Sequence, residues 1–222
     1  MSTTLPLFPL GSVLYPGLVL PLHIFEERYR RLVADLLAGP EPRQFGVIAI
    51  RHGRETGVDG VSALYDTGCT AVLREAEAYA DGRYDLITVG ARRFTLLSLG
   101  DQAPYFSGDV DFLTDGVGDE AEAAAAVPAV QQALRSYLDL MRVRGGAEIT
   151  IPDLPAEPVL LSYLVAAAVV VDLPVKQRLL EEPDAHRRLL AERAMLVREM
   201  QMLRSLTSAP APDLRYSPYS QN

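Results

Sequence analysis

The pattern of apolar and polar positions changes near residue 115. Before that point, short apolar runs are interrupted by Gly, Pro and Asp, and they predict strands at residues 45–50, 67–73, 76–80, 84–89, 94–99 and 105–113. After it, apolar residues recur at helical spacing. We therefore expect a β-rich unit over residues 1–114, a helical unit over residues 115–208, and a flexible, proline-containing tail over residues 209–222.

The first thirty residues are apolar enough to suggest a signal peptide or a membrane anchor, but their prolines argue against both. Pro6, Pro9, Pro16 and Pro21 each remove a backbone donor and bias the preceding residue to extended geometry. A signal peptide also needs a basic start, whereas no Lys or Arg precedes Arg28. The segment is thus expected to form short strands and turns whose apolar side chains are buried.

One helix is predicted inside the β-rich unit, over residues 25–37. Gly39 and Pro40 end it, and Asp81-Gly82 predicts a tight turn between two strands. One helix among about six or seven strands favours a small closed or nearly closed sheet. The apolar face of the predicted helix consists of Phe25, Tyr29, Leu32, Val33 and Leu36.

The second unit predicts four helices. The first ends at Gly145-Gly146, and the second, over residues 158–171, is apolar nearly all round, which is typical of a central buried helix. It is shorter than the ~17 residues that a membrane span needs, and Asp172 and Pro174 close it. Helices at 174–182 and 184–206 follow. The first helix carries its apolar stripe at Val127, Val130, Leu134, Tyr137, Leu138 and Met141.

Composition narrows the possible functions. The chain has 21 basic and 29 acidic side chains, a net charge of −8, and the acidic excess is present in both halves. Neither unit therefore has the basic surface that nucleic-acid binding normally requires, and we expect no nucleic-acid or membrane partner. A single cysteine, Cys69, excludes an internal disulfide and suits a reducing cytoplasm.

Candidates for catalysis or metal binding are few. Cys69 is a possible nucleophile with His23 or His52 as its base, but a small buried strand residue is the favoured interpretation. With His186, the three histidines lie in unrelated segments without ligand spacing, so no metal site is expected. The serines lack the Gly-x-Ser-x-Gly context of a nucleophile elbow; those considered are Ser12, Ser62 and Ser98.

Tyrosines, methionines and one leucine are the candidate binding residues. In the β-rich unit they could line a groove for an extended peptide, and flexible thioethers in the helices suit promiscuous contacts. The alternative is that the same side chains are half-buried strand residues or pack between helices. The candidates are Tyr15, Leu18, Tyr65, Tyr84, Tyr105, Met195 and Met202.

A further group of charged residues is expected to hold the fold together. Glu26, Arg28 and Arg30 open the first predicted helix, and Arg92 and Arg93 lie in a strand region. We expect ion pairs or hydrogen bonds that lock helix to sheet, rather than ligand contacts.

Several of these fragments, in this order, resemble the substrate-binding N-terminal domain of Lon-type ATP-dependent proteases. The resemblance begins at Leu5-Pro6-Leu7-Phe8-Pro9-Leu10, returns at Gly90-Ala91-Arg92-Arg93-Phe94 and at Lys176-Gln177-Arg178, and covers roughly residues 4–206. The residues that match the family pattern are expected to be structural. They are Pro9, Pro16, Gly17, Pro21, His23, Phe25, Glu26, Arg28, Tyr29, Gly68, Asp81, Gly82, Arg83, Gly90, Arg93, Phe94 and Lys176.

The resemblance implies an α+β fold: a PUA-like β pseudobarrel with one helix, followed by an α-helical bundle. It also implies recognition of unfolded or tagged protein segments. The sequence departs from full Lon proteases, because no Gly-x-x-x-x-Gly-Lys-Ser/Thr loop is present and Lys176 is the only lysine available for a Ser–Lys dyad. We therefore expect a stand-alone, non-catalytic binding module with no catalytic residue and no cofactor.

Other functions remain open at this point. The module could be an adaptor or regulator of a full-length Lon protease, and a weak homodimer is plausible. A small hydrolase and an RNA-binding PUA-like protein are the less favoured alternatives.

Overall fold

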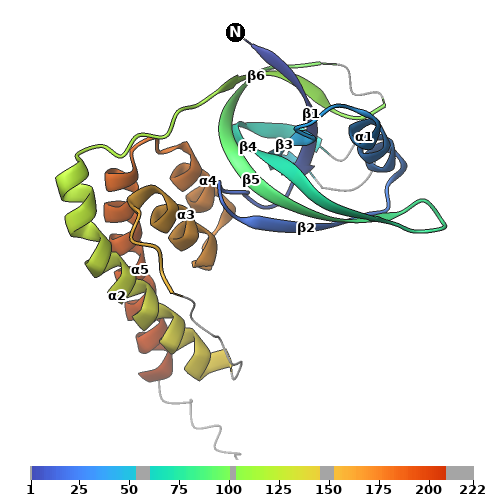
Figure 1. The fold of residues 1–222 in the computed structure, drawn as a ribbon. Helices are drawn as coiled ribbons and strands as arrows, with labels where there is room; N and C mark the ends of the chain where they lie inside the picture. The colour runs from blue at the N-terminus through green and yellow to red at the C-terminus, as the bar shows by residue number, and fades with distance from the viewer. Residues whose placement is uncertain (1, 54–60, 101–103, 146–152, 209–222) are drawn as a thin grey trace, which may run out of the picture.

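The computed structural model describes residues 2–53, 61–100, 104–145 and 153–208. Within these residues the fold is mixed α+β, with six strands and five helices. Figure 1 shows the strands and helix α1 gathered on one side of the molecule and helices α2 to α5 on the other. The last strand ends at Phe112 and the next helix begins at Glu120. The predicted tail, residues 209–222, lies outside the described residues.

The six strands form one sheet in the order β2-β5-β4-β3-β1-β6, and β6 also pairs with β5. The pairing therefore runs from β1 through β3, β4, β5 and β6 back to β1, with β2 attached to β5 alone. All neighbours are antiparallel except β1 and β3. The strands are β1 (Thr3–Leu10), β2 (Val19–Ile24), β3 (Gln44–Gly53), β4 (Val61–Ala78), β5 (Tyr84–Leu99) and β6 (Ser107–Phe112).

Strands β4 and β5 are each one long strand where the sequence predicts two, so the predicted interruptions are wrong. Register shifts between Cys69 and Ala71 and between Leu73 and Glu75 show why: the extra residues bend the strands without ending them. The bend allows the first half of β5 to pair with β2 and the second half to pair with β6.

Helix α1 (Glu27–Ala38) buries Tyr29, Leu32 and Val33 as predicted. It begins two residues later than expected, because Glu26 has an extended backbone with ψ 137°. The prediction that Phe25 belongs to the apolar helix face is therefore wrong; its side chain precedes the helix and is 55% exposed.

Four helices follow, and the apolar one among them is central as predicted. Helix α3 packs against α2, α4 and α5. Glu157 caps it by accepting hydrogen bonds from the amides of Val159 and Leu160 at 2.9 and 2.6 Å. It ends at Ala168, before the predicted residue 171, because Val169 is extended. The helices are α2 (Glu120–Gly145), α3 (Pro158–Ala168), α4 (Leu173–Glu181) and α5 (Ala185–Ser208).

No helix in the described part of the chain combines the length and the apolar character that crossing a membrane requires.

One buried guanidinium connects the strands to the helices. Arg93 of β5 donates through Nη1 to the Leu180 carbonyl at 2.9 Å and through Nη2 to the Thr114 carbonyl at 3.3 Å. Its Nε lies 2.5 Å from Asp115 Oδ1, which also accepts a 2.7 Å hydrogen bond from the Tyr163 hydroxyl. Arg93 thus links β5 to α4, whereas the sequence analysis expected such a lock beside the first predicted helix.

Candidate functional site

A small apolar pocket opens where strands β1 and β2 approach the start of α1. Its volume is about 120 Å³, which suits one apolar side chain. Its lining comes from the end of β1, the end of β2, the two residues that follow β2, and Tyr29 of α1 (Glu27–Ala38). The lining residues are Phe8, Pro9, Leu10, Leu22, His23, Ile24, Phe25, Glu26 and Tyr29.

Among the described residues, each of these two strands has an edge without a strand partner. Strand β2 pairs with β5 only, and β6 pairs with the first half of β1, up to Pro6. In the β2–β5 ladder the amide of Gly90 donates to the Leu18 carbonyl at 2.8 Å. Because alternate residues of an antiparallel strand bond to the same neighbour, the main-chain groups of Val19, Pro21 and His23 face the open side.

Pro21 has no N–H, so this edge offers an incoming strand three carbonyl acceptors and two N–H donors, those of Val19 and His23. A proline at the centre of an edge limits uncontrolled strand pairing.

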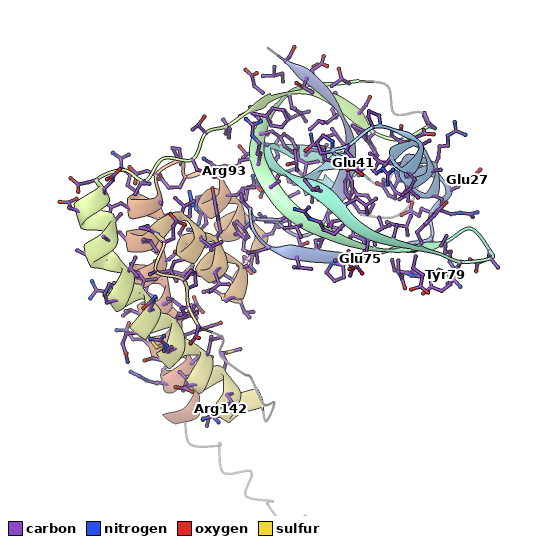
Figure 2. The ribbon with its side chains drawn as sticks, viewed as in Figure 1. Glu27, Glu41, Glu75, Tyr79, Arg93 and Arg142 are labelled. Carbon is purple, nitrogen blue, oxygen red and sulfur yellow. The ribbon has the colours of Figure 1, made fainter. Side chains whose placement is uncertain are left out.

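Exposed apolar side chains lie along β2 and the neighbouring β4–β5 hairpin, with the polar side chains of His23 and Asp85 between them. Val19 and Phe25 are 62% and 55% exposed, and Tyr79 and Ile87 are also exposed. Ile87 lies opposite Glu75 in the β4–β5 ladder. Figure 2 shows Glu75 and Tyr79 along the β4–β5 hairpin. We call Val19, Phe25, Tyr79 and Ile87 the apolar strip.

A polar network borders the pocket at the β4–β5 turn. Asp85 accepts hydrogen bonds from the Tyr79 hydroxyl at 2.5 Å and from His23 Nδ1 at 2.6 Å. The Tyr79 hydroxyl, and then His23, lower the pKa of the Asp85 carboxyl. Arg83 Nη1 lies 3.4 Å from His23 Nε2, and its Nε donates to Asp81 at 2.8 Å. These contacts hold the His23 ring in one orientation at the pocket mouth.

The comparisons with known proteins identify the family. The chain matches the family described as the ATP-dependent protease La (LON) substrate-binding domain over residues 4–198. This chain belongs to the Lon substrate-binding domain family. The resemblance on which the sequence prediction rested is therefore confirmed.

Bacterial Lon proteases match across most of this Lon-family domain. The Lon protease of Anaeromyxobacter dehalogenans is 28% identical over 206 residues, covering 92% of this chain and 24% of that protein. Lon protease 2 of Myxococcus xanthus is 29% identical over 202 residues, covering 90% of this chain and 24% of that protein. The chain thus spans about a quarter of the length of these relatives.

Solved structures share the fold of this domain. The Lon N-terminal domain protein from Xanthomonas campestris superposes with a TM-score of 0.58 at 23% identity, covering 94% of this chain and 99% of that one. The N-terminal domain of the Mycobacterium avium complex Lon protease gives a TM-score of 0.62 at 15% identity, covering 88% of this chain and 98% of that one. At these identities the likeness concerns the fold alone.

The predicted peptide-binding residues of this Lon-family domain do not share an exposed surface. Tyr15 is buried, with its hydroxyl donating to the Lys176 carbonyl at 2.9 Å, and Met195 is buried among the helices. Neither side chain has surface to offer a peptide, because each helps fill the core between the helices. Met202 is exposed near the end of α5. The half-buried candidates are Leu18, Tyr65, Tyr84 and Tyr105.

Sequence reasoning missed the residues that do line the pocket. It placed Phe25 on a helix face and expected His23 to be a structural residue of the family pattern, whereas His23 is exposed and lines the pocket. The available signal was Pro21 followed by apolar residues, which marks an edge strand with open main-chain groups.

The proposed nucleophile is unsuitable. Cys69 is fully buried, and burial raises the pKa of its thiol to about 12, which keeps the reactive thiolate scarce at neutral pH. His23 and His52, the suggested bases, both lie on the exposed surface. In the described parts of the chain, no three His, Cys, Asp or Glu side chains are grouped so that they could hold a metal ion.

A buried carboxyl in the helices gives a testable pH dependence. Glu192 of α5 is fully buried, and among the described residues neither carboxyl oxygen has a hydrogen-bond partner. Burial raises the pKa of Glu192 well above its usual value, against the opposing charge of Arg188. Burial and then Glu192 also raise the pKa of the nearby Tyr15 hydroxyl.

We expect Glu192→Gln to raise the melting temperature at pH 8 more than at pH 4.5. The folded-state pKa of Glu192 is raised above its unfolded-state pKa. The wild-type protein therefore loses stability as the pH rises from the unfolded-state pKa through the folded-state pKa. A neutral amide avoids that loss. Thermal melts of both proteins at the two pH values test this, and an equal or smaller gain at pH 8 would contradict it.

Proposed function

We propose that this chain is a non-catalytic module that binds apolar, unfolded protein segments at the pocket between β1 and β2. The observation that carries the proposal is the pocket itself, which joins two unpaired strand edges to the apolar strip. Membership of the Lon substrate-binding domain family supports it. The lone buried cysteine is consistent with a reducing cytoplasm as the site of action.

The geometry suits an extended segment with one apolar anchor. The open carbonyls of β2 would accept main-chain N–H groups, which are available only in a segment that has lost its own secondary structure. The pocket would take one side chain, and the apolar strip would cover its neighbours. A folded protein presents neither feature, so the module would discriminate by conformation.

We expect Val19→Asp to weaken binding of an unfolded protein about tenfold, because it places a charge in the apolar contact. The probe is fluorescein-labelled lactalbumin, reduced and carboxymethylated so that it stays unfolded, and the measurement is fluorescence anisotropy. Native lactalbumin with its disulfides intact should not bind.

Val170→Asp is the matched control, since Val170 is 68% exposed and Val19 is 62% exposed. Val170 follows α3, outside the apolar strip, and its substitution should leave affinity unchanged. If the wild-type protein does not bind unfolded lactalbumin at several hundred micromolar, the proposal is wrong. If the two variants lose affinity equally, the binding site does not lie where we place it.

We also propose that the closed run of strand pairings is a PUA-like β pseudobarrel and that α2 to α5 form a helical bundle. The ring of pairings from β1 back to β1 supports the first statement. We further propose that the chain is divided into two domains, residues 1–114 and 115–208. Three apolar clusters support this division: one lies mainly among the helices, and two lie among the strands and α1.

Association with a full-length Lon protease is the second candidate function. It is favoured by the match to the substrate-binding part of proteins about four times as long. An adaptor of this kind would change the rate at which a purified Lon protease degrades an unfolded substrate. An unchanged rate at saturating module would argue against it.

A further inference from the structure

Helix α5 carries a second apolar face that the fold leaves uncovered. Its inner face packs on α2 and α3, with Leu189 and Leu196 fully buried. On the opposite side Leu190 and Val197 are 48% and 42% exposed, and Ala194 between them is exposed too. Residues 190, 194 and 197 follow the 4-then-3 spacing of a coiled-coil seam over one heptad, and in this register Arg187, Gln201 and Arg204 occupy the adjoining a and d positions.

Arginines border this seam on both sides. If Leu190 and Val197 take the d positions and Ala194 the a position, Arg193 falls at g and Arg198 at e. Both side chains are exposed, and neither forms an ion pair with any of the described residues.

The same face has no carboxylate of its own. Of the two glutamates on α5, Glu192 is buried, and Glu199 lies five residues from Ala194, about 140° around the helix. A basic seam on a chain of net charge −8 is a local reversal of the overall charge. The e and g positions set partner choice in paired helices, and cations at both favour carboxylates opposite.

A second copy of this chain does not fit the seam. Two α5 helices paired through this face would place Arg193 and Arg198 of one copy near those of the other, and like charges at these positions oppose pairing. A lipid surface fits poorly as well, because the seam has no aromatic side chain and its centre is an alanine. The alanine instead allows a second helix to approach closely.

We propose that the outer face of α5 is a docking seam for an acidic amphipathic helix of a partner protein. The partner helix would present apolar residues at a and d and carboxylates at e and g. This seam is formed by the helices, whereas the peptide pocket is formed by strands and α1. The inference therefore goes beyond the proposed function, and each can fail without the other.

Two 21-residue peptides test the proposal on the unaltered chain. Both carry leucine at a and d; one carries glutamate at e and g, the other lysine, and like charges keep each peptide monomeric. We expect the glutamate peptide to bind at least about tenfold more tightly by fluorescence anisotropy, with the preference falling between 50 and 300 mM NaCl. Equal binding of the two peptides would overturn the proposal.

Charge reversal locates the contact. Arg193→Glu combined with Arg198→Glu should invert the preference toward the lysine peptide. The matched control reverses two exposed arginines of α2, Arg135 and Arg142, the latter labelled near the end of α2 in Figure 2, and should change nothing. Circular dichroism checks that both variants fold.

Other occupants are distinguished in the same assay. Phosphatidylserine vesicles and a 20-nucleotide RNA are measured against the wild-type chain and the Arg193/Arg198 variant. Binding of either one through these arginines, without a preference for the glutamate peptide, would overturn the proposal. So would a glutamate-peptide affinity that the Arg193/Arg198 reversal leaves unchanged.

Discussion

Replacing Arg93 by methionine is expected to lower the free energy of unfolding by about 3 kcal/mol, at the lower end of the range for breaking a buried ion pair. The guanidinium is fully buried and bonds to Asp115 and to the carbonyls of Thr114 and Leu180. Methionine fills similar space but leaves these acceptors without their donor. Asp115 keeps its hydrogen bond from Tyr163 and some exposure to water, which limits the loss.

Arg92→Met is the matched control. Arg92 is the preceding residue, but its side chain is exposed and stacks over the Phe112 ring, with Cζ 4.2 Å from the ring centroid. Losing that contact should cost less than about 1 kcal/mol. Urea unfolding followed by circular dichroism measures both variants. Equal losses would show that Arg93 does not connect the strands to the helices.

Gly90→Ala is expected to cost about 3 kcal/mol, the upper end of the usual range for overpacking. A β-carbon at Gly90 would overlap the backbone carbonyl of Tyr15, and a main-chain atom cannot rotate away as a side chain can. The Gly90 amide and carbonyl also bond to Leu18 and Gly17, each at 2.8 Å, so any shift strains this crossing of chains. The measurement is again urea unfolding.

Gly116→Ala provides the comparison. A β-carbon there would meet nothing closer than the Pro183 carbonyl at 3.6 Å, and the backbone of Gly116 is not in the left-handed region. We expect its effect to stay within about 0.5 kcal/mol. If Gly90→Ala proves as mild as Gly116→Ala, then the close approach of β5 to the Tyr15 loop is not a constraint on the fold.

Local sequence patterns were enough to predict the helices. The stripe from Val127 to Tyr137 predicted the buried face of α2, and Pro158 predicted the first turn of α3. The Asp81-Gly82 turn is also where it was expected, with Gly82 at φ +81°. In each case the signal is carried by neighbours in sequence, whose backbone geometry depends little on distant residues.

Predictions that depended on the partner of a side chain were less successful. Met195 was a candidate binding residue, yet it is buried, because α5 packs against both α2 and α3. Tyr15 was a candidate for lining a peptide groove, but it is buried in the apolar cluster that lies mainly among the helices. Phe25 fits a helical period, and the extended backbone at Glu26 removes it from the helix.

The sequence by itself determined the family, the sequence of element types, and the glycine and proline positions that shape the turns. These follow from short-range periodicity and from residues whose backbone freedom is unusual. Only the tertiary structure decided that the edges of β1 and β2 stay unpaired around a pocket, that Arg93 connects sheet to helix, and that α5 keeps an outer face. The physical reason is that burial and pairing depend on contacts between residues far apart in the chain, and those contacts exist only after the strands and helices have packed.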